Sequence, residues 1–400
     1  MWATWASNAN FVGIFFYRGI IHELNRPNAG LSLGFNFRWI LKQLAVNDLI
    51  LNQKMSSCET EACTLNTVKD IYNAWSQSGS EFKYGYSGTL DNKIKEALSL
   101  VHPEITKRFY GCGVAVPEKL QGQNVLDLGC GSGRESFVIS SLIGPNGHVT
   151  GIDMTEDLVK VANEYIDYHK EKYGIEKTNM EFKLGYIEKL GEIGIGGDSC
   201  DVLVSNGVIN LTPDKKAVLA EAYRVLKTGG ELYFSDVYCS TELSDDVRKN
   251  QHLWGQCIAG TLWWKKLFDM AKEIGFSEPR LVEVAPVPIC NKQYKDLLGD
   301  ARFLSATYRL FKLPDKTSTS AILQYQGDIP GCESAFRLDV RNIFKKGELR
   351  PVDGTVATII TTSRFKDNFK IIQNQVINPF DYLDELDAGG NRPVDAYSVE

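Results

Sequence analysis

The stretch Asn124-Val-Leu-Asp-Leu-Gly-Cys-Gly-Ser-Gly133 decides the fold of this 400-residue chain. Its first five residues are typical of a short buried strand, and the glycines that follow allow a tight turn with exposed backbone. A helix pattern then runs over residues 134–143 and ends at the turn Gly144-Pro-Asn-Gly147. A strand, a glycine loop and a helix in this order predict a ligand site at the carboxyl end of the strand.

Strand and helix patterns alternate on the C-terminal side of this unit. Helices are predicted over 155–173, 212–227 and 261–274, the second with Thr212 as its N-cap and Pro213 at its first position. Strands are predicted at 148–153, 180–184, 201–204, 231–235, 281–284 and 307–311. This alternation predicts an α/β fold, with a Rossmann-like, doubly wound sheet.

The spacing of the glycines indicates which ligand the site binds. Dinucleotide sites use G-x-G-x-x-G, whereas here G-x-G-x-G follows the acidic Asp127, which suits an amine better than a phosphate. Asp153 lies twenty positions after Gly133, at the end of the second strand, where a carboxylate can accept both ribose hydroxyls. Together these residues predict an S-adenosylmethionine-dependent methyltransferase. A Rossmann-like domain for another nucleotide is the alternative.

Composition argues against several other classes of function. The net charge of −6 leaves no Lys/Arg excess for a phosphate-binding face, so no nucleic-acid partner is expected. The apolar run 12–17 is far shorter than the roughly 20 residues that a membrane span needs, so no membrane partner is expected either. The nine cysteines include no Cys-x-x-Cys pair. We expect mostly free thiols in a reducing compartment, and hence a cytoplasmic protein.

The two ends of the chain differ in composition from the middle. Residues 1–54 are poor in acidic residues and rich in Asn, Ser and aromatics. They are interpreted as an N-terminal extension: a loose tail, a mitochondrial transit peptide, or a segment upstream of a start at Met55. Residues 376–400 are acidic without clear periodicity, and a loose tail is expected there.

A series of short blocks carries a family resemblance through its order and number. The blocks are Arg108-Phe-Tyr-Gly-Cys-Gly113, Val125-Leu-Asp-Leu-Gly-Cys-Gly-Ser-Gly-Arg134, Gly147-His-Val-Thr-Gly-Ile-Asp-Met154, Gly185-Tyr-Ile-Glu-Lys-Leu-Gly191, Ser205-Asn-Gly-Val-Ile-Asn-Leu211, Gly229-Gly-Glu-Leu-Tyr-Phe-Ser-Asp-Val-Tyr238, Leu253-Trp-Gly-Gln-Cys257 and Ser305-Ala-Thr-Tyr-Arg-Leu-Phe-Lys312. In sequence and order they resemble the eukaryotic arsenite methyltransferases, over about three quarters of the chain.

The resemblance implies a domain plan and a cofactor site. It implies a methyltransferase domain at 55–240, an acceptor region completing the sheet at 241–312 and a smaller α+β domain at 313–375, in a monomer. By matching position, Ile187 and Glu188 would lie beside the adenine and Tyr72 would cover the cofactor. The full set implied to bind S-adenosylmethionine is Tyr72, Asp127, Gly129, Gly131, Asp153, Met154, Ile187, Glu188 and Asn206.

The family pattern also has four cysteines, of which two remain. Cys112 and Cys257 would be the catalytic arsenic ligands, whereas Lys83 and Gly207 occupy the other two positions. Trivalent arsenic is soft and prefers thiolates. Arsenite takes three thiolates and a monomethylated arsenical takes two. The pair therefore fits the methylated form, or arsenite with glutathione or another thiol as the third ligand.

The missing cysteines leave the small-molecule acceptor open. Cys58 and Cys63 are candidates to supply further thiols. The space at Gly207 would also admit an organic nucleophile, methylated at sulfur, nitrogen or carbon, and a third alternative is a non-catalytic metalloid binder. Aromatic rings near Cys257 are expected to pack the core rather than cover such a substrate: Trp254, Trp263 and Trp264.

Three smaller expectations concern local structure. The runs 320–325 and 356–360 are predicted as strands of the C-terminal domain. His169 is predicted on a helix surface rather than as a base. Cys130, in the glycine loop, is predicted to be structural.

Overall fold

The computed structural model describes residue 68 and residues 90–255, 257–289 and 292–372. The predicted extension 1–54 and the acidic tail 376–400 lie outside the described residues. So do four residues singled out above: Cys58, Cys63, Tyr72 and Lys83.

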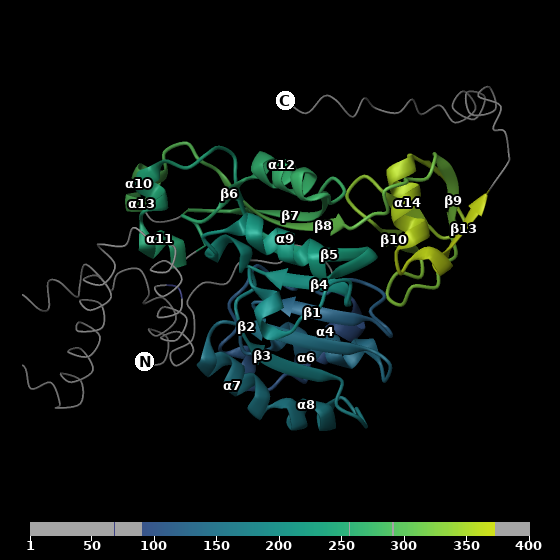
Figure 1. Ribbon diagram of the computed structural model, residues 1–400, viewed down its shortest axis with the longest axis horizontal. Helices are drawn as coiled ribbons and strands as arrows, with labels where there is room; N and C mark the ends of the chain where they lie inside the picture. Colours follow the sequence, from purple (N-terminus) through teal and green to yellow (C-terminus); the bar gives the residue numbers. More distant parts are fainter. Residues whose placement is uncertain (1–67, 69–89, 256, 290–291, 373–400) are drawn as a thin grey trace, which may run out of the picture. The chain divides into compact units, whose positions relative to one another are not determined.

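One large sheet organises the described chain (Figure 1). Its strands run in the order β3-β2-β1-β4-β5-β8-β7, with the short β6 paired to β5. The strands from β3 to β5 are parallel, and β8 is antiparallel to both of its neighbours. The bounds are β1 Asn124–Leu128, β2 His148–Asp153, β3 Met180–Leu184, β4 Cys200–Asn206, β5 Leu226–Cys239, β6 Leu262–Trp263, β7 Arg280–Val287 and β8 Phe303–Phe311. This order confirms the predicted α/β fold.

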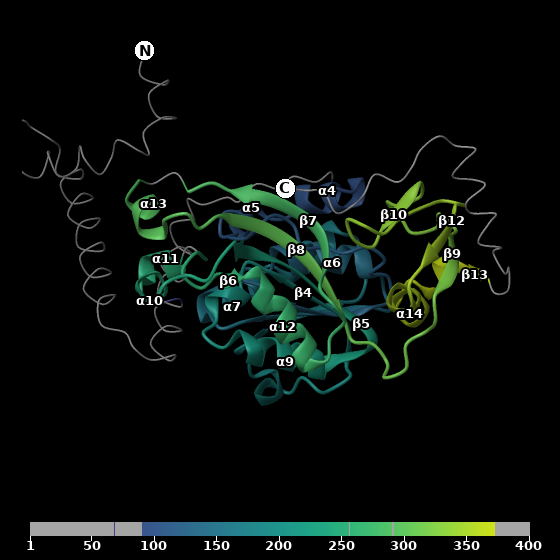
Figure 2. The same cartoon turned by 90° about the horizontal axis from the view of Figure 1, so that it is seen from above.

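Helices cover both faces of the sheet, as the alternation of side chains along β1 requires (Figures 1 and 2). Val125 faces one core with α4 (Asn92–Ser99), α6 (Arg134–Ile143) and α7 (Glu156–Glu164). Leu126 and Leu128 face a second core with α9 (Lys215–Val225) and α12 (Trp264–Ile274). The remaining helices are α5 Pro103–Thr106, α8 Ile166–Lys172, α10 Asp245–Arg248, α11 Gln251–Gly255 and α13 Lys292–Leu298.

Three predicted helices have different bounds from those expected. The helix expected at 155–173 is divided at Tyr165 into α7 and α8. The helix expected at 212–227 begins at Lys215, because Asp214 and not Thr212 is its N-cap, accepting from the Ala217 N–H at 2.9 Å. The helix expected at 261–274 begins at Trp264, since the two residues before it pair with β5.

The prediction for His169 was wrong, because the residue is fully buried in α8. Its ring stacks on Phe137 at 3.6 Å between centroids, and its Nε2 accepts from the His102 N–H at 3.2 Å. Burial lowers the pKa of His169 to about 4. The imidazole is therefore a neutral part of the core, as its partners in α6 and before α5 require.

The C-terminal part forms a small sheet and a helix around an aromatic core (yellow in Figure 1). Its antiparallel order is β12-β9-β13, and a hairpin of β10 and β11 packs nearby. The bounds are β9 Ala321–Tyr325, β10 Ala335–Arg337, β11 Ile343–Lys345, β12 Leu349–Val352, α14 Gly354–Thr362 and β13 Phe369–Ile372, with the 3₁₀ turn η3 Lys366–Asn368 before β13. Two further 3₁₀ turns, η1 Leu190–Ile193 and η2 Ile209–Leu211, belong to the large-sheet region before and after β4.

The strand predicted at 320–325 is confirmed as β9, whereas the strand predicted at 356–360 is wrong. Those residues lie in α14, which the Asp353 side chain caps by accepting from the Val356 N–H at 2.9 Å. All five are buried, so the run shows neither the period of a strand nor that of a half-exposed helix. A short, wholly apolar run cannot be assigned by periodicity.

A buried ion network joins the large sheet to the C-terminal part. Glu231 on β5 is fully buried and accepts from Arg309 of β8 at 3.3 Å and from Arg364 at 2.6 Å. Arg309 also pairs with Glu118, and Arg364 donates to the Glu118 carbonyl. Three of these four charges are buried and Glu118 is partly exposed. A buried charge is tolerated only when it is paired, so the network depends on every member.

Replacing Glu231 should therefore destabilise the protein strongly. Glu231→Ala leaves two buried arginines short of a partner, and we expect the free energy of unfolding to fall by about 3–5 kcal/mol. Urea unfolding followed by circular dichroism measures this. The matched control is Lys216→Ala, which breaks an exposed pair with Glu273 and should change stability by less than about 1 kcal/mol. If the two variants lowered the free energy of unfolding equally, Glu231 would not hold a buried ion network together.

Candidate active site

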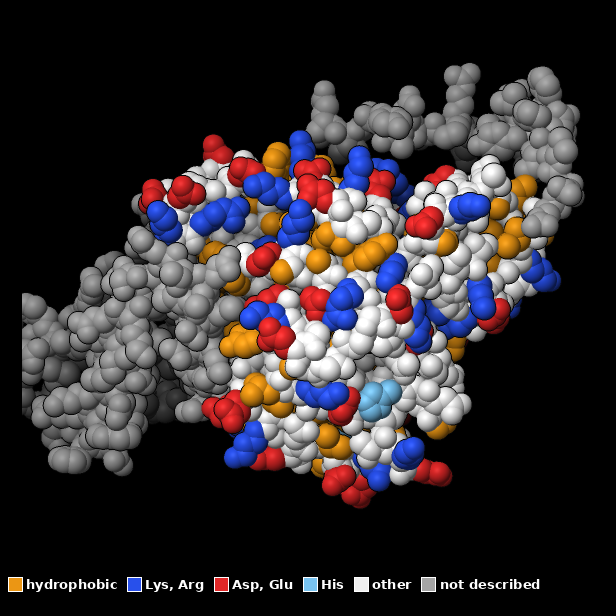
Figure 3. Space-filling model, viewed as in Figure 1, with side chains coloured by type: hydrophobic (Ala, Val, Ile, Leu, Met, Phe, Trp, Pro, Cys, Tyr) orange, Lys and Arg blue, Asp and Glu red, His pale blue; other side chains and the backbone are white. Residues whose placement is uncertain are grey.

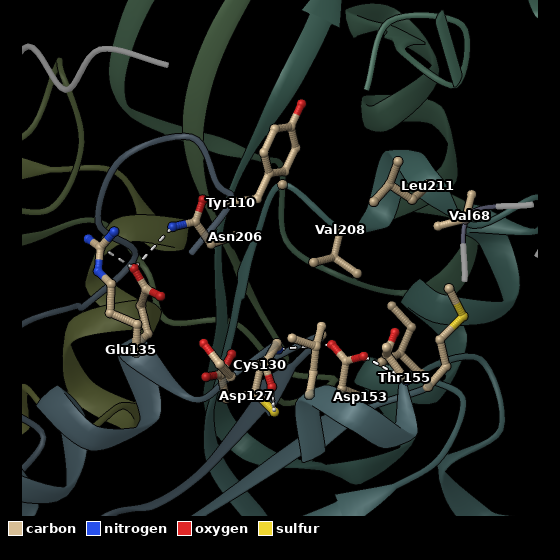
Figure 4. A pocket seen from close by; sticks show the side chains of 18 of the residues that line it. Val68, Tyr110, Asp127, Cys130, Glu135, Asp153, Thr155, Asn206, Val208 and Leu211 are labelled. Carbon is tan, nitrogen blue, oxygen red and sulfur yellow. Dashed lines mark hydrogen bonds and ion pairs between the residues drawn. The ribbon is translucent and has the colours of Figure 1, made fainter. Parts of the chain in front are cut away.

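A cavity of about 880 Å³, open to solvent, lies at the carboxyl ends of β1, β2 and β4 (Figure 4). The glycine loop after β1, the end of β2, residues 185–188 after β3 and residues 206–208 after β4 form much of its wall. The strand order reverses at β1, which is where doubly wound sheets bind their ligands. Its size suits a nucleoside-sized small molecule.

The cavity brings together most of the residues predicted to bind the cofactor. Eight of the nine line it, and the ninth, Tyr72, lies outside the described residues. The eight are Asp127, Gly129, Gly131, Asp153, Met154, Ile187, Glu188 and Asn206. They come from segments that are up to about 80 residues apart, so the shared wall supports the predicted site. Their contacts with a cofactor remain a prediction.

The glycine loop forms the floor that the prediction requires. Gly129 and Gly131 have φ of +74° and +56°, a region that side chains disfavour. A Cβ at Gly131 would meet no atom within 4 Å, so its backbone faces open space. A Cβ at Gly129 would instead overlap Val208. Beyond the loop, α6 begins at Arg134, so the loop leads directly into the N-terminus of a helix.

Three buried carboxylates give the cavity a strongly acidic lining: Asp127, Glu135 and Asp153. Burial raises the pKa of Asp127 to about 7, although Ser136 donates to it at 2.6 Å. Asp153 accepts from the Gly131 and Thr155 N–H groups at 2.9 and 2.8 Å, and burial still raises its pKa. Such a lining favours a ligand that carries positive charge. S-adenosylmethionine carries a positive sulfonium and an amine, so it fits this lining of carboxylates.

Sequence reasoning did not single out Glu135 and Arg134, which also line the cavity. Burial raises the pKa of Glu135, and the adjacent Arg134 guanidinium opposes this. Arg134 lies over the Phe109 ring at 3.5 Å from the centroid and donates to the Gly113 carbonyl at 3.3 Å. The available signal was their position in the first turn of a helix that directly follows a glycine loop.

The two predicted arsenic ligands are both close to Gly207. A Cβ on Gly207 would be 3.5 Å from the Cys112 Sγ, and the Cys257 Sγ donates to the Gly207 carbonyl at 3.3 Å. Both cysteines are buried in the same apolar cluster. Cys257 has φ +58°, a strained value for a residue other than glycine and one found at functional sites. Three positions predicted from the family pattern, 112, 207 and 257, therefore lie close together. Of these, Gly207 lines the cavity, whereas Cys112 and Cys257 are buried behind it and are not among its lining residues.

The environment of Cys112 keeps its sulfur protonated in the resting protein. Burial and the nearby Asp236 raise the pKa of the Cys112 thiol, and a hydrogen bond from Ser305 opposes the shift. Cys200 begins β4, at the end away from Gly207, as the sequence indicated. Within the described residues no group of three or more His, Cys, Asp or Glu side chains could hold a metal ion.

The other aromatic and thiol residues near the site have packing contacts. Trp254 donates to the Leu211 carbonyl at 3.1 Å, and Trp254 and Trp263 pack in the cluster that contains both cysteines. Trp264 is more exposed, at 41%. Cys130 is buried against Gly151 and Phe182.

The described surface in Figure 3 is mixed in charge on the face in view. Acidic and basic side chains are interspersed there among the described residues (Figure 3). None of the described helices is both long and apolar enough to span a bilayer.

A doubly wound sheet whose glycine loop and acidic cavity suit a cationic nucleoside defines an S-adenosylmethionine-dependent methyltransferase. Family models agree: one described as a methyltransferase domain matches residues 119–275, and one described as an arsenite methyltransferase C-terminal domain matches residues 318–392.

The chain is also similar in sequence and structure to individual arsenite methyltransferases. The chain is 52% identical to human arsenite methyltransferase over 280 residues, covering 70% of this chain and 74% of that protein. It is 44% identical to the arsenite methyltransferase of Aquipseudomonas alcaligenes, covering 76% and 90%. An arsenic(III) S-adenosylmethionine methyltransferase from Chlamydomonas reinhardtii superposes with a TM-score of 0.69 at 39% identity, covering 72% of this chain and 98% of that one. The chain belongs to the arsenite methyltransferase family.

The raised pKa of Asp127 predicts a pH-dependent cofactor affinity. Asp127 holds a proton below its pKa of about 7, and a neutral carboxyl attracts an amine only weakly. Affinity for S-adenosylmethionine should therefore rise with pH, by roughly tenfold between pH 6 and pH 8. Isothermal titration calorimetry at several pH values measures this.

The controls separate Asp127 from its neighbours. Asp127→Asn should bind more weakly and with a flatter pH profile, whereas Asp153→Asn should bind more weakly and keep the slope. A flat profile in the wild-type protein would show that Asp127 does not carry the effect.

Proposed function

We propose that this enzyme methylates a trivalent arsenical held by Cys112 and Cys257, with monomethylated arsenic preferred over arsenite. The observation that carries this proposal is the convergence of the two thiols on Gly207, which itself lines the cofactor cavity. An acceptor bound at the two thiols would lie next to the cavity whose acidic lining favours S-adenosylmethionine.

Ligand exchange at arsenic is compatible with two buried thiols. When a thiol replaces a hydroxyl on arsenic, its proton leaves with the hydroxyl as water, so no separate base is needed. In a monomethylated arsenical, two cysteine sulfurs and the methyl group complete the three bonds of trivalent arsenic and leave its lone pair as the nucleophile. Bound S-adenosylmethionine supplies an electrophilic methyl group on a sulfonium sulfur. The protein's contribution is orientation and the exclusion of water.

Arsenite requires one more ligand than the two cysteines supply. Gly207 has no side chain, and Cys239, which is buried in the same cluster, directs its Sγ to the Thr241 carbonyl at 2.9 Å. We propose that glutathione or another small thiol fills the third position when arsenite is the substrate and keeps both cysteines reduced. A two-cysteine site without it favours acceptors in which one valence is already occupied by carbon.

Removing either thiol should abolish methylation of arsenic. We expect Cys112→Ser and Cys257→Ser each to lower methyl transfer to methylarsonous acid by at least about 100-fold, because one sulfur cannot orient the acceptor. Transfer of radiolabelled methyl groups measures this. Cys200→Ser is the matched control, a buried thiol at the far end of β4, and should retain activity. Full activity in both site variants would overturn the arsenic site. Binding of S-adenosylmethionine without arsenical turnover by the wild-type enzyme would point instead to an organic acceptor.

Restoring a thiol at position 207 should change the preference. A Cβ at this position would make ordinary contact with the Cys112 sulfur at 3.5 Å, so Gly207→Cys brings a third sulfur to the site. The φ of +69° will cost about 1–2 kcal/mol of stability. We expect turnover of arsenite to rise relative to methylarsonous acid and to depend less on added glutathione.

Gly207→Ala separates the thiol from the strain, because it has the same backbone penalty and no sulfur. Its substrate preference should stay that of the wild-type enzyme. If the alanine and cysteine variants change preference equally, position 207 acts through shape rather than as a ligand position.

A further inference from the structure

The Asn206 side chain holds three consecutive residues of the loop that carries Cys112. Its Oδ1 accepts from the Cys112 N–H at 2.6 Å, and its Nδ2 donates to the Gly113 carbonyl at 3.2 Å. A Cβ on Gly111 would lie only 2.9 Å from the same amide, so the loop backbone rests directly on it. Asn206 itself ends β4 and is buried. The position of Cys112 is therefore set by a side chain 94 residues away.

The same amide reaches into the cofactor cavity. Its Nδ2 also donates to the buried Glu135 at 3.3 Å (Figure 4). Glu135, Asn206 and Arg134 all line the cavity, and Arg134 holds the loop a second time through the Gly113 carbonyl. A ligand in the cavity thus meets the groups that position Cys112.

The other anchor of Cys112 does not face the cavity. The Ser235 hydroxyl of β5 donates to the Cys112 carbonyl at 3.2 Å, and Ser235 is not among the residues that line the cavity. This bond fixes the loop whether or not a ligand is bound. The contacts through Asn206 and Arg134 face the cavity and can respond to the cofactor.

We propose that Asn206 is a positioning residue that couples cofactor binding to the placement of the Cys112 thiol, so that cofactor and trivalent arsenical bind cooperatively. The proposal rests on the proposed function for the identity of the second ligand. A cationic group beside Glu135 fixes that carboxylate, Glu135 fixes the Asn206 amide, and the amide fixes the backbone of Cys112. Fixing the Cys112 backbone in this way favours methyl transfer, because a misplacement of the reacting groups by about 1 Å can reduce the rate about 100-fold.

The coupling is measurable without turnover. S-adenosylhomocysteine keeps the amine and cannot transfer a methyl group. In the full chain, we expect saturating S-adenosylhomocysteine to lower the Kd of methylarsonous acid about tenfold, within the usual range for coupled sites. Quenching of intrinsic tryptophan fluorescence reports binding, since Trp254 and Trp263 pack in the cluster with both cysteines. In Asn206→Ala, the Kd of methylarsonous acid should be about the same with and without S-adenosylhomocysteine, so the ratio of these two Kd values should fall to about one.

Asp153→Asn is the matched control. Asp153 lines the same cavity but bonds to Gly131 and Thr155 and not to the Cys112 loop. It should weaken cofactor binding while keeping the tenfold ratio at saturation. Asn206→Asp keeps an acceptor for the Cys112 N–H but faces Glu135 with a like charge. Its Kd for methylarsonous acid should therefore no longer change with S-adenosylhomocysteine, although the loop is still anchored. This variant also serves if the alanine variant does not fold.

A second readout is independent of arsenic. The rate at which N-ethylmaleimide labels Cys112, followed by peptide mass spectrometry, should fall several-fold with S-adenosylhomocysteine in the wild-type protein and not in Asn206→Ala. If methylarsonous acid fails to bind while this response persists, the arsenic function is wrong and the positioning role stands. A wild-type Kd ratio of one, or an unchanged ratio in both Asn206 variants, would overturn the coupling.

Discussion

The carboxyl end of β4 joins the two halves of the site, and the rest of the arrangement depends on it. Asn206 and Gly207 are adjacent in the chain, yet one bonds to the Cys112 backbone and to Glu135, and the other is close to both the Cys112 and Cys257 sulfurs. Both also line the cavity, so in the proposed function the cofactor and the acceptor bind against the same two residues. In a methyl-transfer enzyme, such an arrangement fixes the distance between donor and acceptor through the rigid edge of a sheet.

The acidic cavity is unfavourable to the empty protein and favourable to the complex. Burial raises the pKa values of Asp127, Glu135 and Asp153, which means that each loses hydration that its hydrogen bonds only partly replace. A cationic ligand offsets this loss and a neutral one does not. Of these three carboxylates, Glu135 also accepts from Asn206, which holds the Cys112 loop, so the proposed coupling joins cofactor selectivity to the placement of that loop.

Most of the sheet could be predicted from the sequence because parallel strands are short apolar runs bounded by glycines and helix caps. The glycine loop, Asp127 and Asp153 were placed correctly at one edge because a switch point in such a sheet has only one position. The run 356–360 could not be assigned, since all five residues are buried and the run has no exposed polar face to give it a period. His169 was misplaced because its partners, Phe137 and His102, lie 32 and 67 residues away. The role of Asn206 depends on a contact of the same kind, across 94 residues.

Gly207 shows how one missing side chain can redirect an inherited site. Its φ of +69° is a conformation that glycine adopts freely and a cysteine adopts only with strain, so the backbone here is relaxed where a third ligand would strain it. The two remaining sulfurs converge on that glycine from separate elements, one on the loop before β1 and one after α11. In the proposed function, two cysteine sulfurs supply two of the three bonds of trivalent arsenic, and the third bond comes from the substrate or from solution. An arsenical that already carries a methyl group supplies that bond itself, whereas arsenite would take it from a thiol in solution. The proposed preference for methylated arsenicals thus follows from the one ligand that the protein does not supply.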